Sequence, residues 1–221
     1  MTMSKFHPPV ELLMEHAAGS ACEAVDLLVA CHTTYCVECR TRVAELEGLG
    51  ARLSLGDAAS QEGDAAALSD LLARLDSDAS QVDVAAATPA VEDPLFPTPL
   101  LHYTGPSDQV AWKRVLPGVY LFELDLRWGD VPIRLTRARA GRGIPKHTHE
   151  GYECDLILQG GLHDLTRGGD FERGDVQAAD ETVTHELRAL EGEDCILVAF
   201  NEGRPQGRSI GAKLLYRYLG W

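Results

Sequence analysis

The sequence predicts an α+β multidomain protein, in which a small all-α bundle of four helices precedes an all-β barrel. Residues 1–77 carry helix start and stop signals and apolar residues at helical spacing, with almost no strand signals. Residues 77–99 contain four prolines and are rich in Ala, Asp and Thr, a composition typical of a linker. Beyond them, short alternating or apolar runs are separated by Gly, Pro and Asp turns. We therefore expect a helical domain at 1–85, a linker at 86–99 and a barrel at 100–221.

The first two helices are predicted from their ends. Pro8 and Pro9 favour the start of a helix, which runs to about residue 18 and which Gly19 closes. Ser20 and Glu23 have the spacing of a capping box for the second helix. The apolar residues of this second helix recur at helical spacing and lead to a histidine; they are Val25, Leu28 and Val29, followed by His32.

Two further helices are predicted from leucine spacing. The third is expected to follow Cys39 and to end before Gly50, with an apolar side made of Val43, Leu46 and Leu49. The fourth carries Leu68, Leu71, Leu72 and Leu75. A bundle of fewer than about 80 residues has a small core, and such bundles usually depend on a metal for stability.

A metal site is predicted in the barrel at His147, His149 and Glu153. A strand places both imidazoles of a His-x-His pair on one face. The spacing of these residues between Gly141 and Gly160 resembles the first signature motif of the cupin jelly-roll barrels. That resemblance implies one more ligand from a second motif, for which the chain offers His185. The second motif is incomplete, because the Pro-x-Gly that cupins place before this histidine is missing. Imidazole and carboxylate ligands suit zinc, manganese, iron or nickel alike.

A second metal site is predicted near the N-terminus, where His32, Cys36 and Cys39 form a His-x3-Cys-x2-Cys motif. Thiolates combined with imidazole favour structural zinc. A helix that ends near residue 35 brings His32 and Cys36 to one side, four residues apart. A tetrahedral site needs a fourth ligand. His7 is the best candidate because it lies just before a predicted helix, and Cys22 and Cys31 compete with it.

Charge and composition narrow the possible partners. The formal net charge of −14 argues against direct binding to nucleic acid and favours a basic protein partner. The acidity is strongest in residues 1–90, which hold 14 acidic and 5 basic side chains. We see no signal peptide and no apolar run of membrane-spanning length, and we expect a cytoplasmic protein. In a reducing compartment, its six cysteines favour metal ligation over disulfides.

The two motifs in this order resemble the ChrR-type anti-sigma factors, which join an N-terminal zinc domain to a cupin barrel. The likeness extends from His7 to the barrel. It implies an inhibitor that binds an extracytoplasmic-function sigma factor through residues 1–85. It also implies that the cupin barrel senses oxidative stress, by singlet oxygen or organic peroxide, and releases the sigma factor.

Two other functions use motifs that resemble parts of the sequence. The cupin motif also occurs in metal-dependent enzymes, so a dioxygenase or isomerase with a helical zinc-binding appendage is the alternative. Against it, we recognise no further set of acidic, basic or substrate-binding residues. A zinc-finger DNA-binding protein fits the acidic charge poorly.

Overall fold

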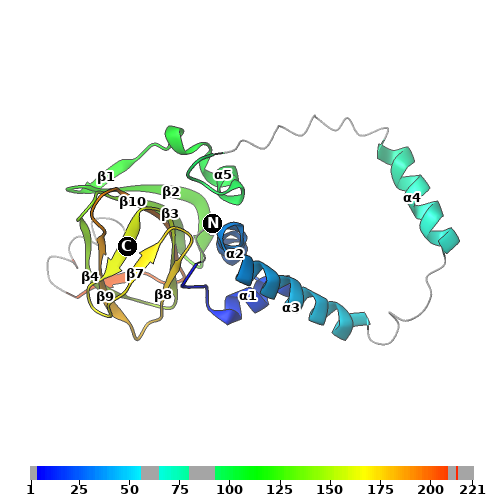
Figure 1. The fold of residues 1–221 in the computed structure, drawn as a ribbon, viewed down its shortest axis with the longest axis horizontal. Coiled ribbons are helices and arrows are strands. Elements are labelled where there is room, and N and C mark those ends of the chain that lie inside the picture. The colour runs from blue at the N-terminus through cyan, green and yellow to red at the C-terminus, as the bar shows by residue number, and fades with distance from the viewer. Residues whose placement is uncertain (1–3, 56–64, 80–92, 209–212, 214–221) are drawn as a thin grey trace.

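The computed structural model describes residues 4–55, 65–79, 93–208 and 213. In these ranges, helices at the N-terminal end pack against a β-sandwich built from two sheets (Figure 1). The predicted fold class is confirmed. No helix within these ranges is both long and apolar enough to cross a membrane.

The first two helices follow the prediction in their extent. Helix α1 (Val10–Ala17) begins directly after Pro9, and Gly19 follows it with a φ of +66°, the left-handed conformation that ends many helices. Helix α2 spans Glu23–Tyr35. The predicted capping box is wrong, because Cys22 occupies the N-cap and the Ser20 hydroxyl donates to the carbonyl of Glu15 instead. The tight turn after α1 therefore uses the Ser20 hydroxyl that the capping box would have needed.

Helix α3 (Val37–Leu55) is longer than predicted at both ends. It starts before Cys39 rather than after it, and Gly50 lies inside it without ending it. A glycine in a helix interior lowers helix stability by only about 1 kcal/mol relative to alanine. The residues on either side can therefore keep the helix continuous across Gly50.

Helix α4 (Ala65–Ala79) forms where the leucine spacing predicted it, but it stands apart from the other helices in Figure 1. Its leucines 68, 71 and 72 are each more than half exposed. Of the four predicted helices, α1, α2 and α3 pack together.

An additional helix, α5 (Thr98–Thr104), lies across the predicted junction of linker and barrel and packs on α2. No periodic pattern predicts this helix, because it has only seven residues. A short 3₁₀ helix at Ser107–Gln109 follows it.

The described strands form two antiparallel sheets. One has the order β1-β2-β3-β10-β5-β8 and the other has the order β11-β4-β9-β6-β7. The strands are β1 (Lys113–Leu116), β2 (Val119–Trp128), β3 (Val131–Ala138), β4 (Gly143–His149), β5 (Glu153–Gln159), β6 (Gly161–Asp164), β7 (Asp170–Glu172), β8 (Val176–Ala179), β9 (Thr184–Ala189), β10 (Cys195–Asn201) and β11 (Pro205–Gly207).

One apolar core joins the helices to the barrel. Leu28 of α2 and Leu100 of α5 are fully buried in the same cluster as Leu124 of β2 and Phe200 of β10. A separate cluster that includes Leu162 and Leu187 lies within the barrel. The helices thus cover one face of the six-stranded sheet, and that contact places the N-terminal motif beside the barrel.

Candidate metal centres

Three strands of the barrel bring four ligand-type side chains to one point. His147 and His149 lie on β4, two residues apart, so their rings share a face. Glu153 begins β5, and His185 on β9 is paired in register with His147. All four side chains are buried. We refer to them as the barrel cluster.

The donor atoms of the barrel cluster converge closely. The Nε2 atom of His185 lies 2.9 Å from that of His149 and 3.2 Å from that of His147. One carboxylate oxygen of Glu153 lies 3.1 Å from the Nε2 atoms of both His149 and His185. The four donor atoms all lie within 4.8 Å of one another.

The hydrogen bond of His147 and the pKa shifts of His185 and Glu153 fit a bound cation. The Nδ1 atom of His147 lies 2.8 Å from the carbonyl oxygen of Pro145. This contact favours the proton on Nδ1 and leaves a lone pair on Nε2 that can bind a metal. Burial lowers the pKa of His185 below its usual value, against the attraction of Glu153. Burial opposes ionisation of Glu153 as well, but the three imidazoles outweigh it and hold the Glu153 pKa well below its usual range. A carboxylate facing several imidazole nitrogens is a ligand set for a divalent transition metal.

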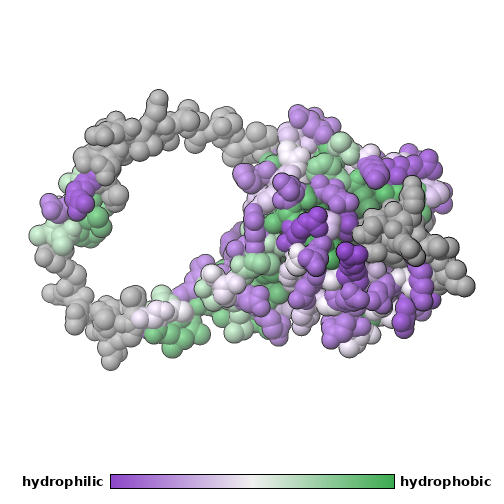
Figure 2. All heavy atoms as spheres, turned by 180° about the vertical axis from the view of Figure 1, so that it is seen from behind, coloured by the Kyte–Doolittle hydropathy of each residue, from purple (hydrophilic) through white to green (hydrophobic). Residues whose placement is uncertain are grey.

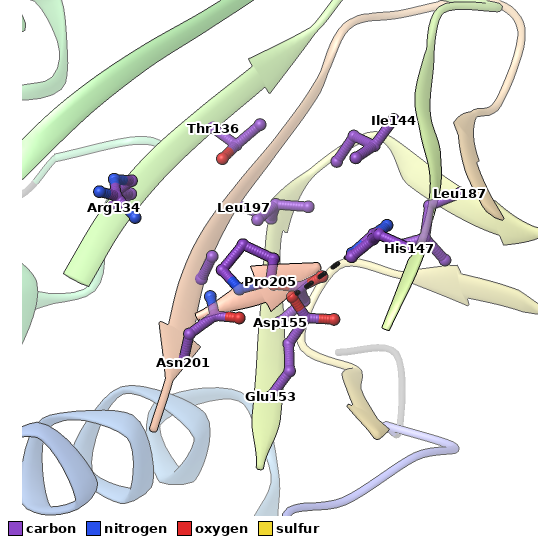
Figure 3. Close-up of a pocket in the computed structure, with 11 residues that line it drawn as sticks. Arg134, Thr136, Ile144, His147, Glu153, Asp155, Leu187, Leu197, Asn201 and Pro205 are labelled. Carbon is purple, nitrogen blue, oxygen red and sulfur yellow. Dashed lines mark ion pairs between the residues drawn. The ribbon is translucent and has the colours of Figure 1, made fainter. Parts of the chain in front are cut away.

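A small pocket opens beside the barrel cluster (Figure 3). About 30 Å³ of it is open to a water-sized molecule, which is room for water but not for a sizeable organic substrate. Asp155 and Asn201 line it and are both buried, and each has a side-chain oxygen without a hydrogen-bond partner among the described residues. Burial and the charge of Glu153 raise the pKa of Asp155 well above its usual value. Asp155 was not predicted as a site residue, although it lies two residues after Glu153 on the same strand and strand alternation puts both side chains on one face.

A second cluster forms where α2 meets α3, and we call it the helical cluster. His32 lies in the last turn of α2, Cys36 joins the two helices and Cys39 lies in the first turn of α3. The Nδ1 atom of His7 lies 3.5 Å from the sulfur of Cys36 and 3.4 Å from that of Cys39. The four donor atoms are within 4.8 Å of one another.

The structure brings His7 to the helical cluster, and not Cys22 or Cys31. Cys22 is exposed, and Cys31 is buried elsewhere in the core. Burial raises the pKa of the Cys31 thiol to about 12 against a backbone hydrogen bond, so that side chain stays a neutral apolar group.

The helical cluster fits a thiophilic divalent cation. Burial is the main influence on His32 and lowers its pKa to about 4, so the ring is neutral near pH 7. Its Nδ1–H donates to the carbonyl of Gly174 at 2.9 Å, and its buried Nε2 has no hydrogen-bond partner among the described residues. Burial and the neighbouring Cys36 raise the pKa of Cys39 to about 12, so a cation is needed to stabilise its thiolate. Two sulfurs and two imidazoles suit zinc.

Comparison with known proteins identifies the family. Residues 103–203 match the family model described as ChrR Cupin-like domain. The chain is 32% identical over 218 residues to the anti-sigma-E factor ChrR of Cereibacter sphaeroides, covering 97% of this chain and 98% of that protein. The chain belongs to the ChrR family of anti-sigma factors. The resemblance seen in the two motifs is therefore confirmed.

The ChrR likeness extends to the fold. The crystal structure of Rhodobacter sphaeroides SigE in complex with the anti-sigma ChrR has a chain that matches with a TM-score of 0.70 and 32% identity. The match covers 89% of this chain and 98% of that chain. Membership of the ChrR family favours a regulator over the alternative, a metal-dependent enzyme.

Proposed function

We propose that this protein is an anti-sigma factor that binds and inhibits an extracytoplasmic-function sigma factor. The observation that carries the proposal is full-length similarity to ChrR, a protein whose solved structure is a complex with SigE. In this proposal residues 1–85 bind the sigma factor, 86–99 act as a linker, and the cupin barrel at 100–221 senses oxidative stress, by singlet oxygen or organic peroxide. No direct contact with nucleic acid is proposed, in line with the net charge of −14.

Exposed apolar side chains on the helices support a protein partner. Leu53 near the end of α3 is 76% exposed, and Met14 of α1 is 52% exposed. Figure 2 shows apolar surface at the outer end of α3 and along α4. On α4 the exposed leucines 68, 71 and 72 share one face at helical spacing. Apolar patches of this kind mark protein interaction sites, and a helix with such a stripe suits a groove on a partner.

In the proposed function, the helical cluster has a structural role and the barrel cluster has a sensing role. Zinc held by His7, His32, Cys36 and Cys39 would fix the end of α2 against the start of α3. The barrel cluster would hold zinc or another divalent transition metal such as manganese, iron or nickel. In the second candidate function, a metal-dependent cupin enzyme, the barrel metal would be catalytic. The small volume beside the barrel cluster favours the regulator.

A pull-down tests the proposed function. The zinc-loaded full chain and a chelator-treated sample are each immobilised and exposed to a lysate of the native host, and the retained proteins are identified. The full chain is used because the helices share their core with the barrel. We expect an extracytoplasmic-function sigma factor on the zinc-loaded chain and much less of it on the chelated chain. Absence of any sigma factor from both samples would contradict the proposal.

A further inference from the structure

The turn between β7 and β8 lies between the two clusters. We propose that this turn and the first two residues of β8, together residues 173–177, position two ligands of the helical cluster and couple that cluster to the barrel cluster. The inference deepens the proposed function, because it rests on metal occupancy of both clusters and identifies the part of the barrel that supports the helical one.

The first contact of this turn is with His32. The carbonyl of Gly174 accepts the Nδ1–H of His32 at 2.9 Å, which fixes the ring orientation and leaves Nε2 to face the cluster. Gly174 has a φ of +92°, and a Cβ atom there would lie 2.9 Å from the Cβ of Tyr35. A glycine therefore allows the turn to approach the end of α2 this closely. The barrel supplies the outer hydrogen bond that orients a metal-ligating histidine.

The second contact holds the segment that ends in His7. The buried carboxylate of Asp175 accepts the backbone N–H groups of Lys5 at 2.6 Å and of Phe6 at 3.2 Å. The N–H of Val176 donates to the carbonyl of Phe6 at 3.1 Å. These hydrogen bonds fix the two residues directly before His7 to the barrel.

The ring of Phe6 adds an apolar contact to this attachment. Its centroid lies 4.5 Å from that of Phe171 on β7, at an angle of 47°. Phe171 belongs to the apolar cluster within the barrel, so the contact continues into the barrel interior. Both histidines of the helical cluster are thus held by the same few barrel residues.

The start of β8, directly after the turn, reaches the barrel cluster. Gln177 lies on β8 two residues after Asp175, and its Nε2 lies 3.3 Å from the Nδ1 of His185. An amide N–H at this position requires an unprotonated Nδ1 and so a proton on Nε2 of His185. A metal ion on that Nε2 would instead require Nδ1–H, facing the amide oxygen of Gln177. That oxygen is buried and has no hydrogen-bond partner among the described residues, so a rotated amide would satisfy it.

The contacts with the helical cluster and with the barrel cluster are made by one continuous segment of chain. Gly174 and Gln177 are three residues apart, and strand β8 is paired to β5 in a register that sets Gln177 opposite Asp155. A change in the hydrogen bond at Gln177 is therefore transmitted along one short, hydrogen-bonded segment. Binding at one cluster then alters affinity at the other, and by linkage the effect is reciprocal.

The positioning role is tested in the full chain with cobalt(II) as the metal. Cobalt bound by thiolates gives a charge-transfer absorption that the barrel cluster, which contains no cysteine, does not give, so chelator competition followed at this band reports the helical cluster alone. We expect Asp175→Asn to weaken cobalt affinity there by about 10- to 100-fold, the usual effect of losing an outer-shell partner. Asp170→Asn is the matched control, because Asp170 lies on β7 but bonds only His163 in the described structure.

Unchanged affinity in a folded Asp175→Asn variant would overturn the positioning role. If that variant does not fold, as judged by circular dichroism, Phe6→Ala replaces it, because this change removes the ring contact without removing a buried carboxylate. We expect Phe6→Ala to weaken cobalt affinity as well, and unchanged affinity in that variant overturns the positioning role in the same way.

The coupling is tested by measuring cobalt affinity at the helical cluster in two states, one with metal bound at the barrel cluster and one without it. His149→Ala removes one barrel ligand and leaves the contact between Gln177 and His185 in place. We expect it to change cobalt affinity at the helical cluster by about fivefold or more, a typical coupling between linked sites. When both chains also carry Gln177→Ala, the cobalt affinities of the helical cluster with and without His149→Ala should be nearly equal. Equal affinities in the wild type and His149→Ala overturn the coupling. These readouts are independent of sigma capture, which alone decides the proposed function.

Discussion

Leu28 offers a test of how closely the helices and the barrel depend on each other. Its side chain is fully buried in the apolar cluster that contains Leu100, Leu124 and Phe200. Truncation of a fully buried leucine to alanine costs about 3 kcal/mol, the lost burial plus the cavity that remains. Because this core belongs to both parts, we expect Leu28→Ala to lower the stability of both by the same amount.

The assay is chemical denaturation of the metal-free full chain, followed by two signals. Far-ultraviolet circular dichroism reports mainly the helices. Tryptophan fluorescence reports Trp112 and Trp128, which pack in or against the shared core, once Trp221→Phe has removed the third tryptophan. The control is Leu53→Ala, whose side chain is 76% exposed and should change stability by less than about 0.5 kcal/mol.

Coincident transitions that shift together in Leu28→Ala are the expected result, because a shared core makes unfolding cooperative. Two separate transitions, of which the mutation moves only the helical one, would refute the reasoning and show that the barrel does not depend on α2.

Three further predictions concern the helical cluster and the surface. Replacement of Cys36 and Cys39 by serine should abolish the cobalt–thiolate absorption and reduce sigma capture to that of the chelated chain; retained metal and capture would contradict the proposed zinc role. Burial lowers the pKa of His32 to about 4 in the folded state, while in the unfolded chain the ordinary pKa is about 6.5. Above about pH 6.5 the ring is neutral in both states and the free energy of unfolding is unaffected. As the pH falls toward 4, the unfolded chain binds a proton that the folded chain does not, so the free energy of unfolding decreases. That loss should reach about 3 kcal/mol in the metal-free chain, and denaturation at several pH values should show a flatter profile in His32→Gln. On α4, Leu71→Glu combined with Leu72→Glu should weaken sigma capture at least about tenfold while circular dichroism stays unchanged, because both side chains are about half exposed; full capture would remove α4 from the proposed interface.

The sequence was sufficient for those features that depend on neighbouring residues. The His-x-His pair needs only strand alternation to share a face, and the ends of α1 need only Pro9 and Gly19. The place of His7 just before a helix predicts it as the fourth ligand, and the structure brings it to the two cysteines. Ligation of metal by either cluster stays a prediction.

The features that were missed depend on tertiary contacts. Helix α5 is short and is held by packing on α2, which no local pattern encodes. Asp175 looks like an ordinary turn residue in the sequence, and its role appears only because residues 5 and 6 fold back onto it. The sequence predicts that the third helix ends before Gly50, but a glycine at the end of a helix usually adopts a left-handed conformation, and Gly50 does not have a positive φ.

The hydrogen bond between Val176 and Phe6 has a consequence for solubility. Strand β8 is the last strand on its side of the six-stranded sheet, and the edge of a sheet offers unpaired backbone groups to other chains. The N-terminal segment covers this edge at Val176, and the Phe6 ring shields Phe171 beside it. Release of this segment would expose the edge of β8, whose backbone groups could then pair with another chain. Breaking the hydrogen bonds that hold this segment to Asp175 and Val176 should therefore make the protein prone to self-association.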